Sequence, residues 1–203
     1  PNPPNYAPEN DPYADDWGSF KAGQREQLEA WRRIYYAQTT STDWNIGRLL
    51  TRLQELGLDD NTLVVFTSDH GEMFGAHGRR AKNIFYDEAC RVPMVMRLPG
   101  QLPAGTRSDA CLATPDIMPT LLGLLDLPVP EAAEGLDLSG YARGGGRGAH
   151  DAALLQNTGA CAAWQDGHEW RALRGSRYTY ARYRRDNAEF LFDNRNDPFQ
   201  QRN

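Results

Sequence analysis

The chain has 203 residues, of which 40% are hydrophobic and 10% aromatic, and its formal net charge at pH 7 is −5. This composition suits a folded domain with its own core, and the acidic balance gives no reason to expect nucleic acid as a partner. No apolar run approaches the roughly 18 residues that a membrane-spanning helix requires, so the sequence predicts no membrane span.

The cysteines leave the cellular compartment open. Cys90, Cys111 and Cys161 are an odd number and lie far apart, which favours buried free thiols over a disulfide framework or a metal knuckle. The protein could be periplasmic, secreted or cytoplasmic. Because the first residue is proline and no signal peptide precedes it, we expect an internal stretch of a longer protein.

The first half of the chain predicts an irregular segment followed by a long helix. Residues 1–19 are rich in proline, asparagine and aspartate, which disfavours helix and central strand, but their aromatic side chains suggest that the segment packs against something. From about residue 23 to residue 56, apolar residues recur at helical spacing. The hydroxyl-rich patch at 39–42 is expected to bend this helix or split it in two.

Two apolar runs predict strands of an α/β sheet. Residues 63–67 resemble a short parallel strand buried on both faces, and residues 92–96 a second strand, with 108–113 as a less clear third. Residues 84–90 between them are expected to form a short helix or a turn. Thr114 and Pro115 then predict the cap and first turn of another helix.

The last quarter of the chain changes character after a glycine-rich loop. Short segments with strand-like composition, separated by turns, predict a small antiparallel sheet. We therefore expect two units, an α/β part at residues 1–148 and an antiparallel subdomain at residues 149–203.

The candidate metal-binding and catalytic residues follow the first predicted strand. Asp69 and His70 stand at its carboxyl end, where open α/β sheets bind ligands, and Lys82 follows in a glycine-broken loop. Both side chains could reach one metal only if the backbone turns, which Gly71 permits. The alternatives are structural: Asp69 caps the turn, His70 packs as a neutral ring, and Lys82 belongs to a solvated cationic run with Arg79 and Arg80.

These residues, in this order, resemble the C-terminal half of a type I sulfatase, a family of the alkaline phosphatase superfamily. The resemblance rests on SDHGE at 68–72, GAHG at 75–78, Lys82 and RVPM at 91–94, and it extends through the flanking helices to the final turn. It implies part of an alkaline-phosphatase-like α/β/α sandwich followed by the small antiparallel sheet.

The resemblance also assigns roles. It makes Asp69 and His70 metal ligands and Lys82 the contact to the sulfate oxygens of a sulfate ester substrate, where it would stabilise developing charge. His77 would be structural or would support a metal ligand without touching the metal. Calcium is the usual metal of sulfatases, and manganese, magnesium and zinc remain alternatives.

The family's nucleophile is missing. Sulfatases attack with a formylglycine made from Cys or Ser in the motif C/S-x-P/A-x-R, in which a metal-activated hydrated aldehyde hydrolyses the S–O bond. None of Cys90, Ser108, Cys111 and Cys161 fits that motif. The resemblance therefore implies that the nucleophile and the other metal ligands belong to an N-terminal half, supplied by a longer chain, another chain or an oligomer partner.

Three functions stay open at this point. The first is a sulfuric ester hydrolase, active when complete. The second is a phosphodiesterase or phosphonate monoester hydrolase on the same scaffold. The third is a module without catalysis of its own, which the missing nucleophile favours for the isolated chain.

Overall fold

The long helix α1 (Leu28–Glu55) dominates the first half of the computed structural model, which describes residues 2–146, 149–157 and 168–203. The helix is continuous, so the predicted split at 39–42 is wrong. The hydroxyls of Thr39 and Thr40 donate to the carbonyls of Tyr35 and Tyr36 at 2.9 and 3.0 Å. These bonds satisfy the hydroxyls along the helix without opening its backbone ladder.

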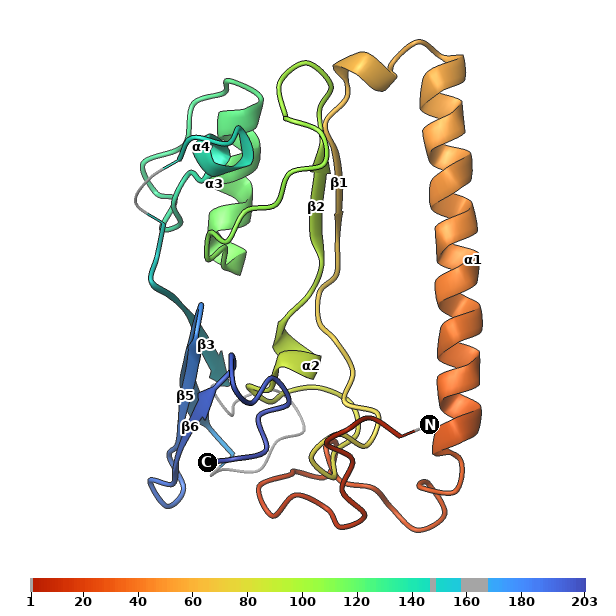
Figure 1. The fold of residues 1–203 in the computed structure, drawn as a ribbon, viewed down its shortest axis with the longest axis vertical. Coiled ribbons are helices and arrows are strands. Elements are labelled where there is room, and N and C mark those ends of the chain that lie inside the picture. Colours follow the sequence, from red (N-terminus) through yellow and green to blue (C-terminus); the bar gives the residue numbers. More distant parts are fainter. Residues whose placement is uncertain (1, 147–148, 158–167) are drawn as a thin grey trace.

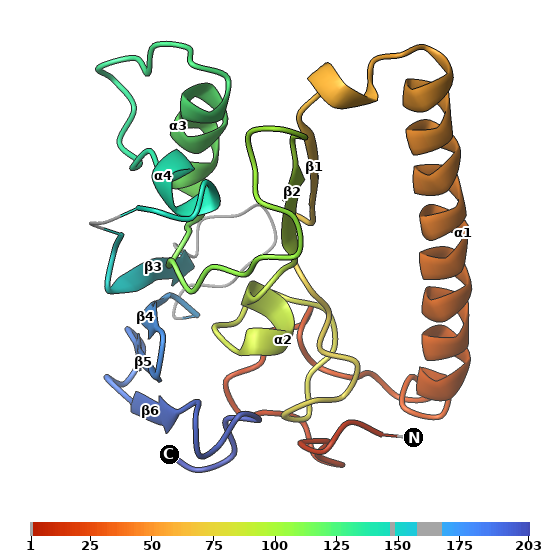
Figure 2. The same ribbon diagram turned by 45° about the horizontal axis from the view of Figure 1, so that its top comes forward.

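Beyond its first turns, where Tyr35 packs edge-on against Phe74 at 4.9 Å between ring centroids, the helix stands apart from the rest of the described chain. Figures 1 and 2 both show it beside the antiparallel pair of β1 (Val64–Thr67) and β2 (Met94–Arg97), and η1 (Asp59–Asn61) connects it to β1. Leu28 is the one helix residue that is buried among the described residues. Most helical stability in proteins comes from packing an apolar face against other elements, and among the described residues α1 has little such packing.

The prediction that 63–67 forms a buried parallel strand is wrong for this chain. β1 pairs antiparallel with β2, with Val64 opposite Arg97 and Thr67 opposite Met94. Phe66 is 42% exposed, because among the described residues no helix covers the pair and no third strand joins it.

The connections after β2 follow the predictions in part. Residues 108–113 form no strand but one isolated bridge, between Cys111 and His150. The helix α3 (Thr114–Leu124) begins one residue earlier than predicted, since the carboxylate of Asp116 accepts the N–H of Ala113 at 2.8 Å. The short helix α4 (Ser139–Ala142) packs beside it.

The predicted antiparallel sheet is confirmed. Four strands form a meander in the order β3-β4-β5-β6, namely β3 (Ala152–Asn157), β4 (Trp170–Gly175), β5 (Tyr178–Tyr183) and β6 (Glu189–Asp193). Its burial alternates along the strands, as expected when one face is packed and the other meets solvent.

The packed face of the sheet covers the segment that follows β1. Phe85 stands at the centre, with ring centroids 5.6 Å from Trp170, 5.9 Å from Tyr183 and 6.5 Å from Phe192. The segment ends in the short helix α2 (Asp87–Cys90), which confirms the predicted helix or turn at 84–90. The core therefore joins the loop after β1 to a sheet that lies about a hundred residues further along the chain.

The proline-rich opening segment also packs, as its aromatic residues indicated. Tyr13 stacks on Tyr183 at 4.4 Å between ring centroids, and Tyr6 forms an isolated bridge with Ala76. The predicted division after residue 148 stays a prediction, and residues 147–148 lie outside the described residues. Within the described ranges, no helix is both long and apolar enough to cross a membrane.

Two neighbours on β6 test the assignment of the packed face. Phe192 is 2% exposed and Leu191 is 54% exposed on the opposite face. Phe192→Ala should lower the free energy of unfolding by about 3–5 kcal/mol, because it leaves a cavity among aromatic rings. Leu191→Ala should cost under about 1 kcal/mol, in keeping with a surface position. Urea unfolding of both variants measures the difference, and equal losses would contradict this core.

Candidate active site

The turn after β1 brings Asp69 and His70 to the same side of the backbone. Asp69 Oδ1 accepts the N–H of His70 at 2.9 Å, and Ser68 Oγ donates to the carbonyl of His70 at 3.0 Å. As a result Asp69 Oδ2 lies 3.4 Å from His70 Nε2. This is the backbone turn that a shared ligand site requires of two adjacent residues.

The hydrogen bonds of His70 suit a metal ligand. Its Nδ1 lies 2.8 Å from the carbonyl of Gly71. Because a carbonyl only accepts, Nδ1 donates this bond, and Nε2 is the ring nitrogen that faces Asp69. Metal-binding histidines commonly donate their other ring N–H to a backbone carbonyl in this way. A separation of 3.4 Å also suits two donors on one ion at ligand distances of about 2.0–2.6 Å.

Asp69 is available to a ligand. Its side chain is 83% exposed, and the N–H of His70 holds the pKa of its carboxyl below the ordinary value. The carboxylate is therefore ionised at neutral pH. In the part of the chain that the structure describes, no further His, Cys, Asp or Glu joins the pair as a third metal ligand. Two donors fall short of the roughly four to eight that such ions take.

Gly71 lets this turn approach α2. Its N–H donates to the carbonyl of Ala89 at 2.8 Å, and a Cβ at this position would collide with the carbonyl oxygen of Glu88. A side chain at residue 71 would therefore push the Asp69–His70 turn away from the aromatic core.

Lys82 lies on the returning limb of the loop. The N–H of Met73 donates to the carbonyl of Ala81 at 2.9 Å, so the chain folds back beside the residues that follow His70. Lys82 is half-buried, and no carboxylate among the described residues pairs with it. Its ammonium group can serve as a point charge for an oxyanion.

The three cations of this loop are not one solvated run. Arg79 is 2% exposed and pairs with Asp11 at 2.9 Å, so the solvated reading is wrong for it. Arg80 donates from Nε to the carbonyl of Trp17 at 3.0 Å. Both arginines are thus tied to the opening segment, whereas no ion pair within the described ranges includes Lys82.

His77 holds the loop against the opening segment and Tyr86. Its ring stacks on Tyr86 with 3.7 Å between centroids, and Asn5 donates to its Nε2 at 2.9 Å. Burial lowers its pKa to about 4. Its backbone N–H also donates to the carbonyl of Asn5 at 2.8 Å, so His77 fixes the loop to the opening segment.

Three residues that hold the loop have no role predicted from the sequence: Asn5, Asp11 and Glu72. Asn5 and Asp11 reach their partners across 72 and 68 residues of chain. No local pattern marks such contacts. Glu72 had a signal, since it stands three residues after Asp69 at the start of the glycine loop.

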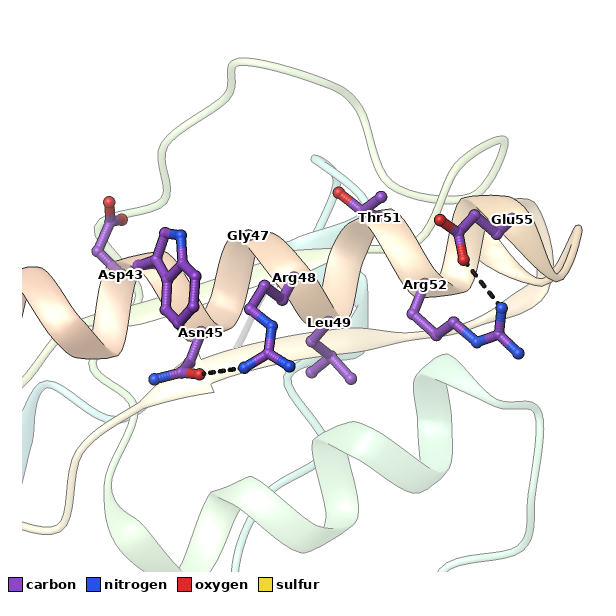
Figure 3. Close-up of a pocket in the computed structure, with 9 residues that line it drawn as sticks. Asp43, Asn45, Gly47, Arg48, Leu49, Thr51, Arg52 and Glu55 are labelled. Carbon is purple, nitrogen blue, oxygen red and sulfur yellow. Dashed lines mark hydrogen bonds and ion pairs between the residues drawn. The ribbon is translucent and has the colours of Figure 1, made fainter.

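A surface hollow lies elsewhere, away from these residues. It measures about 890 Å³ and runs along α1, where it is lined by Asp43, Trp44, Asn45, Gly47, Arg48, Leu49, Thr51, Arg52 and Glu55. Figure 3 shows these side chains along one uncovered helix, with Arg48 bonded to Asn45 and Arg52 to Glu55. Because a single helix supplies the lining, the hollow reflects missing packing and not a ligand site.

The pKa of His77 predicts a pH-dependent stability. Since its folded pKa of about 4 lies below the ordinary 6.5, the unfolded chain binds a proton between these values and the folded chain does not. The free energy of unfolding should therefore fall by on the order of 2–3 kcal/mol as the pH drops from 7 towards 4. His77→Gln can still accept from Asn5 but cannot titrate. Urea unfolding at pH 7 and 4.5 should show a smaller drop in this variant, and identical drops would contradict the assignment.

The chain is similar to known proteins over most of its length. The sulfatase family model matches residues 2–127, and that of the C-terminal region of N-sulphoglucosamine sulphohydrolase matches residues 75–203. An ulvan-active sulfatase of Formosa agariphila is 42% identical over 187 residues, which cover 91% of this chain and 36% of that protein. The chain thus spans about a third of that relative's length.

Solved structures show the same fold. A structure of BT4656 in complex with its substrate D-glucosamine-2-N,6-O-disulfate has a TM-score of 0.80 at 28% identity, and covers 87% of this chain and 36% of that one. Phosphonate monoester hydrolase of Agrobacterium radiobacter has a TM-score of 0.75 at 32% identity, over 86% of this chain and 37% of that one. The expected α/β fold with its small antiparallel sheet is thereby confirmed. The chain belongs to the type I sulfatase family, and its residues 75–203 match a C-terminal region of that family.

Proposed function

We propose that this chain supplies one wall of the active site of a metal-dependent sulfuric ester hydrolase. The observation that carries the proposal is the turn after β1, in which Asp69 Oδ2 and His70 Nε2 lie 3.4 Å apart while Nδ1 is tied to Gly71. Similar proteins support a sulfate ester as substrate, among them the ulvan-active sulfatase and an N-acetylglucosamine-6-O-sulfatase of Bacteroides thetaiotaomicron.

Each residue of this wall has a separate task. Asp69 and His70 would hold a divalent metal, calcium as in other sulfatases, with manganese, magnesium or zinc as alternatives. Bound there, the metal would act as a Lewis acid towards an oxygen of the substrate. Lys82 would bind the sulfuryl oxygens and neutralise the charge that develops on them as the S–O bond breaks.

The described cysteines do not suit a nucleophile. Burial raises the pKa of Cys90 to about 12, and its thiol donates to the carbonyl of Ile84 at 2.9 Å. Burial also raises the pKa of Cys111. A thiol held protonated at neutral pH attacks poorly, while Cys161 lies outside the described residues. These observations support a nucleophile contributed by another part of the protein.

The uncovered surfaces support the same conclusion. Trp44 on α1 is 64% exposed, and Phe66 on β1 and Val95 on β2 are also exposed. A two-stranded pair is marginally stable in water by itself and leaves both outer edges open to pairing. We propose that further polypeptide, as an N-terminal half or a partner chain, covers α1 and extends the β1–β2 pair. It would bring the nucleophile and the remaining metal ligands.

A second hydrolase remains a specific alternative. The similarity to phosphonate monoester hydrolase is nearly as high in TM-score as that to the substrate complex. Assaying the full-length protein with an aryl sulfate, an aryl phosphodiester and a phosphonate monoester separates the two. Sulfate ester hydrolysis should dominate, and a preference for either phosphorus ester would contradict the proposal.

Lys82 gives the sharpest test within this chain, which contains one other lysine, Lys21. In the full-length protein, Lys82→Ala should lower kcat for aryl sulfate by about 10²–10³-fold, because an oxyanion contact is lost at the reacting group. Lys21→Ala is the matched control and should change kcat less than about twofold. Unchanged turnover by Lys82→Ala would remove Lys82 from the mechanism.

The metal ligands can be tested without activity. Calorimetric titration of the full-length protein with Ca²⁺ and Mn²⁺ should show one site. Asp69→Asn and His70→Ala should each weaken metal binding by at least about tenfold. Even the mutation of a residue that only hydrogen-bonds to a metal ligand typically lowers metal affinity by about 10–100-fold. Asp60→Asn, an exposed acid before β1, should bind as the wild type does. Wild-type affinity in both ligand variants would place the metal elsewhere. Stoichiometric binding by the chain alone would also count against an inert module.

A further inference from the structure

We infer that Glu72 is a positioning residue, which sets Lys82 relative to the Asp69–His70 pair. This inference rests on the proposed function and adds to it a side chain that touches neither substrate nor metal. Glu72 stands on the outgoing limb of the loop, and it acts on the returning limb through the backbone.

The contact itself is short and direct. Glu72 Oε1 accepts the N–H of Ala81 at 2.6 Å and, more weakly, the N–H of Phe74 at 3.4 Å. Next to it, the N–H of Met73 donates to the carbonyl of Ala81 at 2.9 Å. Ala81 is therefore held on both its N–H and its carbonyl, one residue before Lys82.

The backbone around Lys82 needs such support. Ala81 and Asn83 have φ angles of +59° and +71°, which L-residues with a side chain rarely adopt. Conformations of this kind persist only where the surroundings hold them, and they cluster at functional sites. The carbonyl of Asn83 accepts from Trp170 Nε1 at 3.3 Å, and Glu72 holds the other flank.

Glu72 has no competing task in the described chain. It is half-buried, and no arginine, lysine or histidine of the described residues forms an ion pair with it. Its carboxylate is used on backbone N–H groups. Because it follows Asp69 by three residues, one side chain links the metal-bearing turn to the sulfate-binding lysine.

A double-mutant cycle in the full-length enzyme tests this link, with aryl sulfate as substrate. Glu72→Ala should lower kcat by about 10–100-fold, as expected when a charged contact is displaced by about 1 Å. In the Lys82→Ala background the same change should cost less than about twofold, because the misplaced group is already absent. Glu72→Gln keeps an oxygen that accepts the Ala81 N–H and should stay within about threefold of wild type. Glu131→Ala, an exposed acid, is the control.

A second measurement separates positioning from loss of fold. Hydrogen exchange at the Ala81 amide should speed up in Glu72→Ala and in the shorter Glu72→Asp, while exchange in the strands β4 and β5 stays unchanged. Equal kinetic losses in both backgrounds, or wild-type exchange at Ala81 in Glu72→Ala, would overturn the inference. A wild-type enzyme that does not hydrolyse sulfate esters would overturn the proposed function instead, and the exchange measurement would then decide alone whether Glu72 holds this amide.

Discussion

The buried pair between Arg79 and Asp11 ties the loop after β1 to the opening segment, and the site depends on that loop. The two side chains meet at 2.9 Å and are 2% and 10% exposed. Removing one partner of such a pair typically costs about 3–5 kcal/mol, because the remaining charge stays buried without compensation. The loop also approaches the opening segment closely at Gly78. A Cβ there would collide with the carbonyl oxygen of Glu9, so a glycine is required.

The loop is fixed from a second side by the C-terminal sheet. Phe85 and Tyr86 pack against the aromatic residues of β4, β5 and β6, and the N–H of Asp87 donates to the side-chain oxygen of Gln200 at 2.9 Å. Segments from the two ends of the chain thus enclose one loop. This packing holds the loop of the candidate site in place. The surfaces of α1 and of the β1–β2 pair, which would face the rest of an active site, are uncovered among the described residues.

Local patterns in the sequence were sufficient for most elements and for the candidate residues. The long helix, the two apolar strands and the four-stranded meander follow from spacing, and Asp69, His70 and Lys82 were picked out by their place after a strand together with the family pattern. The continuity of α1 was not predictable from composition, because Thr39 and Thr40 can either break a helix or bond back to it. Whether a strand is buried also depends on what covers it, and among the described residues no helix covers the β1–β2 pair.

The long-range polar contacts could not be predicted from the sequence, and the reason is physical. Periodicity reports which face of an element is apolar, but a hydrogen bond such as that from Asn5 to Glu88 at 2.6 Å joins residues 83 positions apart. Glu72 illustrates the same limit at short range. Its position in the loop was visible, but the atom it would bind depends on how the returning limb folds back.

Anomalous diffraction from crystals of the full-length protein soaked in Mn²⁺ would test the candidate site most directly. A single peak should lie within about 2.0–2.6 Å of both Asp69 Oδ2 and His70 Nε2, with the ammonium group of Lys82 on the same side of the site. A peak bound by other residues, with Asp69 and His70 still bonded only to each other and to their own backbone, would contradict the assignment of this turn as half of a metal centre.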